Sequence, residues 1–224
     1  MSEFLTVIIP VHNGSAFIHR ALHSVACELP KAKVIVVENG SSDKSIEILK
    51  QIIDSKVLML SQPEANKCRA RNAGAVAANT RFITFLDQDD EITAARADYL
   101  EYLENHEWDV VVGTQKFVLS EAKMIPPYFK SVIDSGNPLY HPITLVIERK
   151  KYLELGGFNE KHRFAEDFEF MTRVNEKSLK VKYSEKSSLI RHFHENNDSR
   201  NIESSRQELF KVLRARAHRA TRNT

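Results

Sequence analysis

The stretch Phe82-Ile83-Thr84-Phe85-Leu86-Asp87-Gln88-Asp89-Asp90 contains an apolar run followed at once by clustered carboxylates. The run 82–86 has the length and composition of a buried β-strand. Carboxylates that stand close together repel one another and resist burial, so this cluster suits a site where a divalent cation or a polyhydroxyl ligand satisfies them. A solvent-facing acidic turn is the alternative. The stretch therefore predicts a strand of a core sheet with a functional site at its end.

Short apolar runs alternate with longer amphipathic ones through the first half of the chain. This pattern is typical of parallel strands joined by crossover helices, which is an α/β fold. We predict strands at Leu5–Val11, Lys33–Val37, Lys56–Ser61, Phe82–Leu86 and Trp108–Gly113. We predict helices at Ala16–Ala26, Lys44–Ile53, Cys68–Ala78 and Ala94–Asn105. Ser42 or Asp43 can cap the second helix and Thr93 the fourth.

The regular alternation fades beyond Gly113, where Pro- and Gly-containing loops intervene. We expect the sheet to be mixed in this half. The predicted strands here are Ile143–Ile147, Leu179–Tyr183 and Ser188–His192, and the predicted helices are Arg163–Lys177 and a terminal helix from Ile202. In the first of these helices Glu166 and Asp167 lie in the first turn, where the helix dipole favours carboxylates.

Composition limits the class of protein. The chain has 224 residues, of which 42% are hydrophobic, enough for the core of one domain. Lys and Arg total 32 against 30 for Asp and Glu, and a formal charge of +2 predicts no affinity for nucleic acid. Only Cys27 and Cys68 are present, which suits a reducing cytosol. The start of the chain lacks the features of a secretory or membrane segment, so we expect a soluble, cytoplasmic protein.

The last residues of the chain are basic. Several cations face only Glu208 there: Arg206, Lys211, Arg214, Arg216, Arg219 and Arg222. Helical spacing predicts that Phe210 and Leu213 pack while the arginines point outward. Such a tail can contact an anionic membrane peripherally. A solvated helix that frays, a helix that packs on the domain, and a helix that pairs two subunits as a homodimer are the alternatives.

Ligands of open parallel sheets bind outside the carboxyl ends of the strands. The residues after the first, second and fourth predicted strands should meet there. Neither a G-x-G-x-x-G nor a G-K-[ST] pattern follows the first strand, which disfavours a nicotinamide or P-loop enzyme. A nucleotide held through a metal instead needs hard oxygen ligands for Mg²⁺ or Mn²⁺, and Asp87 and Asp89 supply them. The metal would act as a Lewis acid on a departing diphosphate.

Several motifs in order resemble the family 2 glycosyltransferases of GT-A fold. They are Thr6-Val7-Ile8-Ile9-Pro10-Val11-His12-Asn13, Val36-Val37-Glu38-Asn39-Gly40-Ser41-Ser42-Asp43, Arg69-Ala70-Arg71-Asn72-Ala73-Gly74 and Phe85-Leu86-Asp87-Gln88-Asp89-Asp90. Gly156-Gly157-Phe158, Glu166-Asp167 and His194-Glu195-Asn196-Asn197 extend the resemblance, which covers Leu5 to Ser199.

The resemblance implies one GT-A domain over residues 1–205, followed by the basic tail 206–224. Its mostly parallel, Rossmann-like half, 1–113, would bind the nucleotide-sugar, and it continues into a smaller mixed half, 114–205, on the acceptor side. The activity implied is that of an inverting, hexosyltransferase-like enzyme. Its donor would be a nucleotide-diphospho-sugar, usually a uridine one, and its acceptor a glycan or a lipid-linked sugar. Such an enzyme uses Mn²⁺ or Mg²⁺ and works at the inner face of the membrane or in the cytoplasm.

The resemblance also implies roles for single residues. Asp167 is the catalytic base, with Glu166 the less favoured candidate. Asp89 is the direct metal ligand, with Asp87 and His194 as further candidates. The donor nucleotide would contact residues from all the strand ends: Pro10, Val11, His12, Asn13, Glu38, Asn39, Arg71, Asp87 and Gln88.

The chain departs from the family pattern at two positions. His12 stands where a tyrosine is common, and Glu38-Asn39 replaces a pair of aspartates. His12 and His194 can also be read as surface or packing histidines, and Arg71 as part of a solvated helix face. A nucleotidyltransferase is the alternative enzyme, although it would normally carry a glycine-rich phosphate loop. A catalytically silent nucleotide-sugar or carbohydrate-binding protein is the alternative from another class.

Overall fold

The computed structural model describes residues 4–52, 56–119, 127–135, 137–195 and 202–222. The strands are β1 (Leu5–Val11), β2 (Lys33–Asn39), β3 (Val57–Gln62), β4 (Phe82–Phe85), β5 (Glu91–Ile92), β6 (Val110–Val118), β7 (Val146–Glu148) and β8 (Val181–His192). The helices are α1 (Ile18–Glu28), α2 (Ser45–Ile52), α3 (Lys67–Ala77), α4 (Ala95–Glu104), α5 (Pro127–Asp134), α6 (Arg149–Glu154), α7 (Glu166–Glu176) and α8 (Ile202–Arg222), with a 3₁₀ turn at Pro142–Thr144.

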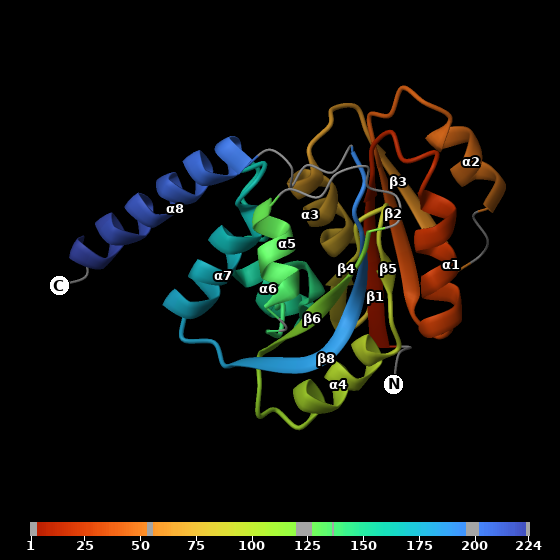
Figure 1. Ribbon diagram of the computed structural model, residues 1–224. Helices are drawn as coiled ribbons and strands as arrows, with labels where there is room; N and C mark the ends of the chain where they lie inside the picture. The colour runs from red at the N-terminus through yellow and green to blue at the C-terminus, as the bar shows by residue number, and fades with distance from the viewer. Residues whose placement is uncertain (1–3, 53–55, 120–126, 136, 196–201, 223–224) are drawn as a thin grey trace.

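The described strands form one 8-stranded sheet in the order β3-β2-β1-β4-β7-β6-β8-β5. The pairs within β3-β2-β1-β4 are parallel, whereas β7 is antiparallel to both of its neighbours. Helices α1 and α2 cover one face of the sheet, and α3, α6 and α7 lie on the other (Figure 1). Every residue of β1 is buried because the strand is central and covered on both faces. The predicted α/β class and mixed second half are confirmed.

The predicted strands and helices of the first half are confirmed within a few residues. Of the two predicted helix caps, one forms and the other does not. The Asp43 carboxylate accepts from the Ser45 amide at 2.9 Å at the start of α2, as predicted. Thr93 does not cap α4, because its hydroxyl donates to the Ser187 carbonyl at 2.7 Å and so ties the segment before α4 to β8.

Two predictions for the second half are wrong. Leu179–Tyr183 and Ser188–His192 are not separate strands, because the polar residues between them stay extended against β6 through register shifts in that pair. Ile143–Ile147 is not one strand either. His141 accepts from the Ile143 amide at 3.2 Å and Pro142 opens a 3₁₀ turn, so β7 starts only at Val146.

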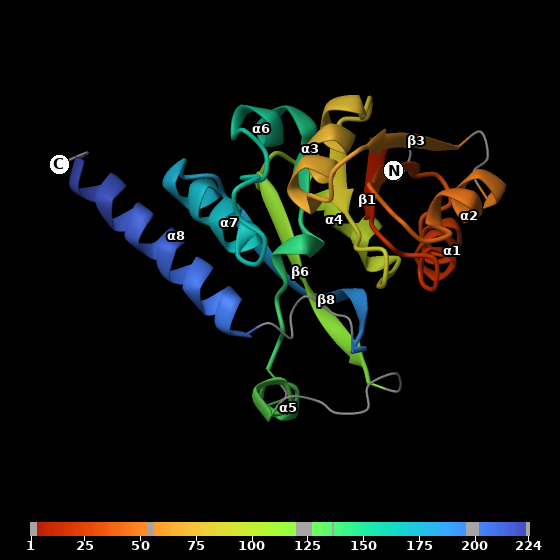
Figure 2. The same ribbon diagram turned by 90° about the horizontal axis from the view of Figure 1, so that it is seen from above.

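The predicted packing side of the terminal helix is also wrong. Phe210 and Leu213 are 57% and 40% exposed, while Val212 is 2% exposed. Helix α8 runs beside α7 in both views (Figures 1 and 2), and Val212 lies one helical turn from Glu208, which bonds to the segment before α7. These contacts orient the helix, and they leave Phe210 and Leu213 on its outer side.

Asn72 of α3 joins two of the sequence motifs. Its side-chain amide donates to the Phe158 carbonyl and its oxygen accepts from the Phe158 amide, both at 2.9 Å. The Tyr152 hydroxyl donates to the same oxygen at 2.7 Å. Gly157 has a φ of +66°, and a Cβ there would collide with the Asn72 side chain. The Gly156-Gly157-Phe158 motif is therefore fastened to α3.

Candidate active site

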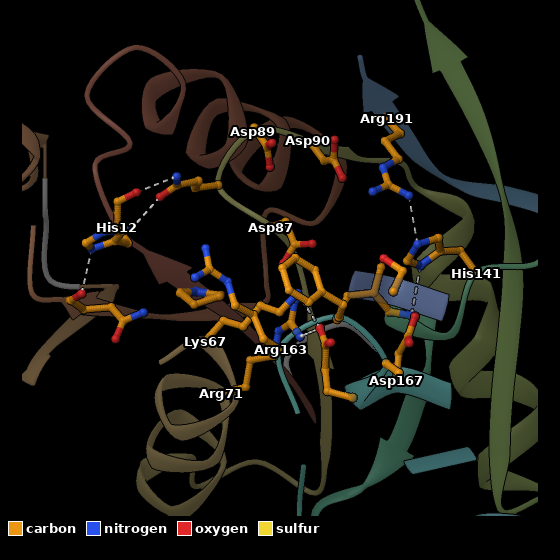
Figure 3. A pocket seen from close by; sticks show the side chains of 18 of the residues that line it. His12, Lys67, Arg71, Asp87, Asp89, Asp90, His141, Arg163, Asp167 and Arg191 are labelled. Atoms are coloured by element: carbon orange, nitrogen blue, oxygen red, sulfur yellow. Dashed lines mark hydrogen bonds and ion pairs between the residues drawn. The ribbon is translucent and has the colours of Figure 1, made fainter. Parts of the chain in front are cut away.

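The carboxyl ends of β1, β2 and β4 open into a cavity of about 1090 Å³. Figure 3 shows His12 at one side of this cavity, Asp167 and Arg191 at the other, and Asp87 and Arg71 between them. Most of the predicted site residues line it: Pro10, His12, Asn13, Asn39, Arg71, Asp87, Gln88, Asp89, Glu166, Asp167 and His194. Val11 and Glu38 do not line it. Val11 is fully buried in β1, and Glu38 is 2% exposed.

The His12 end of the cavity is built from backbone and amide groups. The Gln88 side chain accepts from the His12 amide at 2.8 Å and donates to the His12 carbonyl at 2.9 Å. The His12 ring bonds through Nδ1 to the Asn39 carbonyl at 2.9 Å. These bonds hold the ends of β1, β2 and β4 in register, so the loops that face a ligand are preorganised.

Glu38 holds a turn. Its carboxylate accepts from the Ser41 amide at 2.5 Å and from the Ser61 hydroxyl at 2.9 Å. Burial alone would raise the pKa of Glu38, but the hydrogen bonds from Ser41 and Ser61 outweigh it and the pKa is lowered. Gly40 in this turn has a φ of +70°, which only glycine adopts without strain. The Glu38 carboxylate, which was expected to contact the donor nucleotide, holds the turn at Gly40 and Ser41.

Arg71 is the central ion-pairing residue of the site. It is 1% exposed and donates to Asp87 at 2.5 Å and to Glu166 at 3.1 Å. Lys67 pairs with the same Glu166 oxygen at 2.7 Å. Burial raises the pKa of Asp87, but the charges of Arg71 and then Lys67 outweigh it and lower the pKa to about 2. The solvated-face interpretation of Arg71 is therefore wrong, because a buried cation needs paired acids.

Glu166 and Asp167 are neighbours in sequence with different surroundings. Both line the cavity, but Glu166 is buried and paired with the two cations, whereas Asp167 is only partly buried. Burial and the adjacent Glu166 charge raise the pKa of Asp167. The Phe168 amide donates to it at 2.7 Å. Asp167 thus combines access to the cavity with greater basicity than an ordinary aspartate.

Asp89 and His194 come together from the segments that follow β4 and β8. The Asp89 carboxylate lies 3.0 Å from His194 Nε2, and Phe17 stacks on the imidazole with ring centroids 4.5 Å apart. Asp90 is buried, and burial together with the Asp89 charge raises its pKa well above the ordinary value. One Asp87 oxygen is held by Arg71.

These side chains fit a divalent metal whose coordination shell is completed by the substrate. A carboxylate oxygen and an imidazole nitrogen suit Mn²⁺, and Mg²⁺ is commonly bound by one or two carboxylates plus substrate phosphates and water. Over the part of the chain that the structure describes, no group of three or more His, Cys, Asp or Glu side chains converges on one metal position. Within the described residues, Asp89 and His194 would thus supply only part of a metal's ligand shell.

The structure adds site residues that the sequence did not indicate. His141 and Arg191 face the cavity and contact each other at 3.0 Å between His141 Nε2 and the guanidinium. Burial, and then the Arg191 charge, lower the pKa of His141 to about 3. The cavity is also lined by Arg163 and by Ser205, Arg206 and Leu209 of α8. Lys67 also lines the cavity, and sequence reasoning could have found it, since it lies two residues before the Arg69-Ala70-Arg71 motif.

The comparisons with known proteins agree with this geometry. The model of the family described as Glycosyl transferase family 2 matches residues 6–156. The chain belongs to this family. An uncharacterised glycosyltransferase of Haemophilus influenzae is 27% identical over 196 residues, which cover 82% of this chain and 77% of the relative. Glycosyltransferase GlyA of Streptococcus pneumoniae is 34% identical over 120 residues, 50% of this chain and only 17% of GlyA.

The solved structures identify the fold of this glycosyltransferase family member. The crystal structure of S. aureus TarS 1-349 in complex with UDP-GlcNAc superposes with a TM-score of 0.75 at 20% identity, covering 95% of this chain and 65% of that one. The corresponding structure with UDP gives a TM-score of 0.65 over 84% of this chain and 60% of that one. The GT-A fold is thereby confirmed. Among the residues described, no helix has the length and apolar character needed to cross a membrane.

Proposed function

We propose that this chain transfers a sugar from a nucleotide-diphospho-sugar, with UDP as the nucleotide, to an acceptor hydroxyl with inversion at the anomeric carbon. The observation that carries the proposal is the cavity of about 1090 Å³ in which Asp89 and His194 are in contact and the partly buried Asp167 lines the wall. Family membership supports the reaction class. UDP and UDP-GlcNAc bound to TarS, a protein of the same fold, support the choice of nucleotide.

In this proposal the strand ends bind the donor. His12, Asn13 and Asn39 would hold the base and ribose, and Arg71 would orient Asp87 toward the donor sugar or ribose. Pro10, Val11, Glu38 and Gln88 would shape this wall, Val11 and Glu38 from behind it. Asp89 and His194, with Asp87 as a further candidate, would hold Mn²⁺ or Mg²⁺. That metal supplies Lewis-acid stabilisation of the departing diphosphate.

Asp167 would remove the proton from the acceptor hydroxyl as the oxygen attacks the anomeric carbon. Its raised pKa favours this role, and its place on the cavity wall gives it access to the acceptor. Glu166 is less suited, because Lys67 and Arg71 hold its carboxylate. Glu166 would instead keep the two cations in position behind the base.

The acceptor would be a glycan or a lipid-linked sugar, reached from the cytoplasm or from the inner face of the membrane. The cavity continues past Asp167 to Phe168 and to Leu209 and Arg206 of α8, so its far wall mixes apolar and cationic groups. A nucleotidyltransferase is disfavoured by the lack of a glycine-rich phosphate loop after β1. A silent binding protein is disfavoured because binding alone has no need for a base of raised pKa.

A thermal-shift panel of nucleotide sugars, with and without Mn²⁺, tests the proposal, since a ligand that binds the native state stabilises it by mass action. We expect UDP-sugars to raise the melting temperature only when Mn²⁺ is present. Calorimetry of UDP with Mn²⁺ should then show binding to the wild type and none to Asp89→Ala. Equal affinity of the two proteins would contradict the metal assignment, and a panel without any stabilising donor would contradict the function.

A further inference from the structure

Glu208 of α8 bonds to consecutive backbone amides of the segment before α7. Its Oε2 accepts from the amides of Phe164 at 2.8 Å, Arg163 at 2.9 Å and Ala165 at 3.2 Å. Its Oε1 accepts from the Arg163 amide at 3.2 Å, and His162 Nδ1 lies 3.8 Å from Oε2. Successive amides that point into one concavity bind anions, and hydrogen bonds to a carboxylate are stronger than neutral ones. Glu208 occupies such a concavity.

The segment that Glu208 holds leads directly into the helix that carries Asp167. Ala165 is the N-cap residue of α7, and it makes no side-chain cap hydrogen bond. A helix start leaves amides without intrahelical partners, and a negative charge nearby is favourable to the helix dipole. Glu208, which lies 43 residues after Ala165 in the chain, supplies this carboxylate from α8. The direction of the first turn of α7 therefore depends on α8.

The same side of α8 forms a wall of the cavity. Ser205 and Leu209, which flank Glu208 on the helix, line the cavity beside Asp167, and Val212 is buried one turn further on. The loop residues Arg163 and Phe164 line the cavity as well. Glu208 thus fastens two neighbouring parts of the wall to each other, the loop before α7 and the start of α8.

We propose that Glu208 is a positioning residue that directs the Asp167 carboxylate into the cavity by holding the amides of 163–165. The inference rests on the proposed function, because it takes Asp167 as the base. Asp167 lies at the opposite side of the cavity from His12, and in the proposed function the nucleotide would bind at the His12 end (Figure 3). Loss of the Glu208 charge should therefore lower turnover without weakening the binding of the nucleotide.

The test compares Glu208→Gln with Glu203→Gln. Glu203 lies on the same helix, is exposed, and accepts from Gln207 within α8, so the control makes the same chemical change away from the cavity. Turnover is measured as the release of UDP when water serves as the acceptor, with Mn²⁺ and the donors that stabilise the wild type. The affinity for UDP is measured by calorimetry. We expect kcat for Glu208→Gln to fall about ten- to hundredfold with the Kd for UDP within about twofold. Glu203→Gln should match the wild type.

Amide hydrogen exchange at 163–165 provides a readout that does not depend on activity. Exchange there should be faster in Glu208→Gln than in Glu203→Gln, and Glu208→Asp should restore part of both the protection and kcat. Unchanged turnover, unchanged exchange, or a parallel loss of UDP affinity in Glu208→Gln would each overturn the proposal. If the wild type releases UDP from no donor, the proposed function fails, whereas faster exchange at 163–165 would still support the hold of Glu208 on this segment.

Discussion

At the scale of single residues, the adjacent acids Glu166 and Asp167 differ in the charged groups that surround them. Glu166 faces Lys67 at 2.7 Å and Arg71 at 3.1 Å, so its charge is compensated. Asp167 has its pKa raised by burial and by the Glu166 charge, against the smaller opposing effects of Lys67 and Arg71. A carboxylate of raised pKa accepts protons more readily than an ordinary one. One acid thus serves the ion-pair network, and in the proposed function the other acts on the acceptor.

Asp167→Asn should lower UDP release by roughly 10² to 10⁴, the range expected for the loss of a general base. The Kd for UDP with Mn²⁺ should stay close to that of the wild type, because the amide keeps the size of the side chain. Initial rates at saturating donor measure the effect. Full turnover in Asp167→Asn combined with its loss in Glu166→Gln would exchange the two roles.

The same variant should be more stable than the wild type at neutral pH. The native state binds the Asp167 proton more tightly than the unfolded chain does, so the free energy of unfolding falls as the pH rises toward the raised pKa. Asparagine removes this cost, and we expect a gain of about 1 kcal/mol, a few degrees in Tm. The gain should vanish below the ordinary aspartate pKa, where both states are protonated. Thermal melts of both proteins from pH 3 to pH 8 measure it, and a gain that grows toward low pH would contradict the assignment.

At the scale of elements, α8 illustrates how contacts override an apolar spacing. Val212, one turn from Glu208, is buried, while the larger Phe210 is 57% exposed. The hydrogen bonds of Glu208 to the segment before α7 orient the helix, and the side chain at Val212 packs as a result. The packed side of α8 is therefore chosen by its partner α7.

Val212→Asp should destabilise the protein by about 2 kcal/mol or more, because it places a charge at a position that is 2% exposed. Leu213→Asp is the matched control on the adjacent, exposed position, and its effect should stay within about 0.5 kcal/mol. Urea unfolding of both variants measures the difference. The reverse order of stabilities would restore the packing of Phe210 and Leu213 that the sequence predicts.

At the scale of the whole molecule, positive and negative charges nearly balance, but α8 carries an excess of positive charge. The outer side of this helix carries Phe210 and Arg214, which lie one turn apart. We propose that this side contacts anionic lipid peripherally, with each basic residue contributing about 1 kcal/mol near the surface. Pairing of two subunits through the same side is the alternative.

A variant with Phe210→Ser and Arg214→Gln should bind anionic vesicles less than the wild type does. Lys50→Gln, an exposed change on α2, is the control and should leave binding unaltered. Cosedimentation with anionic and with neutral vesicles measures the partitioning, which should weaken with added salt because surface charges are screened. Equal partitioning of the wild type and the double variant would remove the membrane contact, and a monomer-to-dimer difference between them would favour pairing.

Much of the fold and part of the site follow from the sequence. The apolar runs and helical spacings predict the strands and helices of the first half, because each reflects burial that repeats over neighbouring residues. The carboxyl-end rule predicts that the loops after β1, β2 and β4 meet at one cavity, as the structure has it. Family membership follows from motifs of consecutive residues. The division into 1–205 and 206–224 remains a prediction, and its boundary falls inside α8.

Only the tertiary structure decides which charges pair and which surfaces close the site. Arg71 meets Glu166 across 95 residues, and Glu208 meets Ala165 across 43. The turn role of Glu38, the contact between His141 and Arg191 and the packed side of α8 are of the same kind. Local pattern predicts the buried strands of the sheet, whereas the partner of a buried charge depends on how distant segments pack. Sequence therefore determined the sheet and the place of the site, and packing between distant segments determined the partners within it.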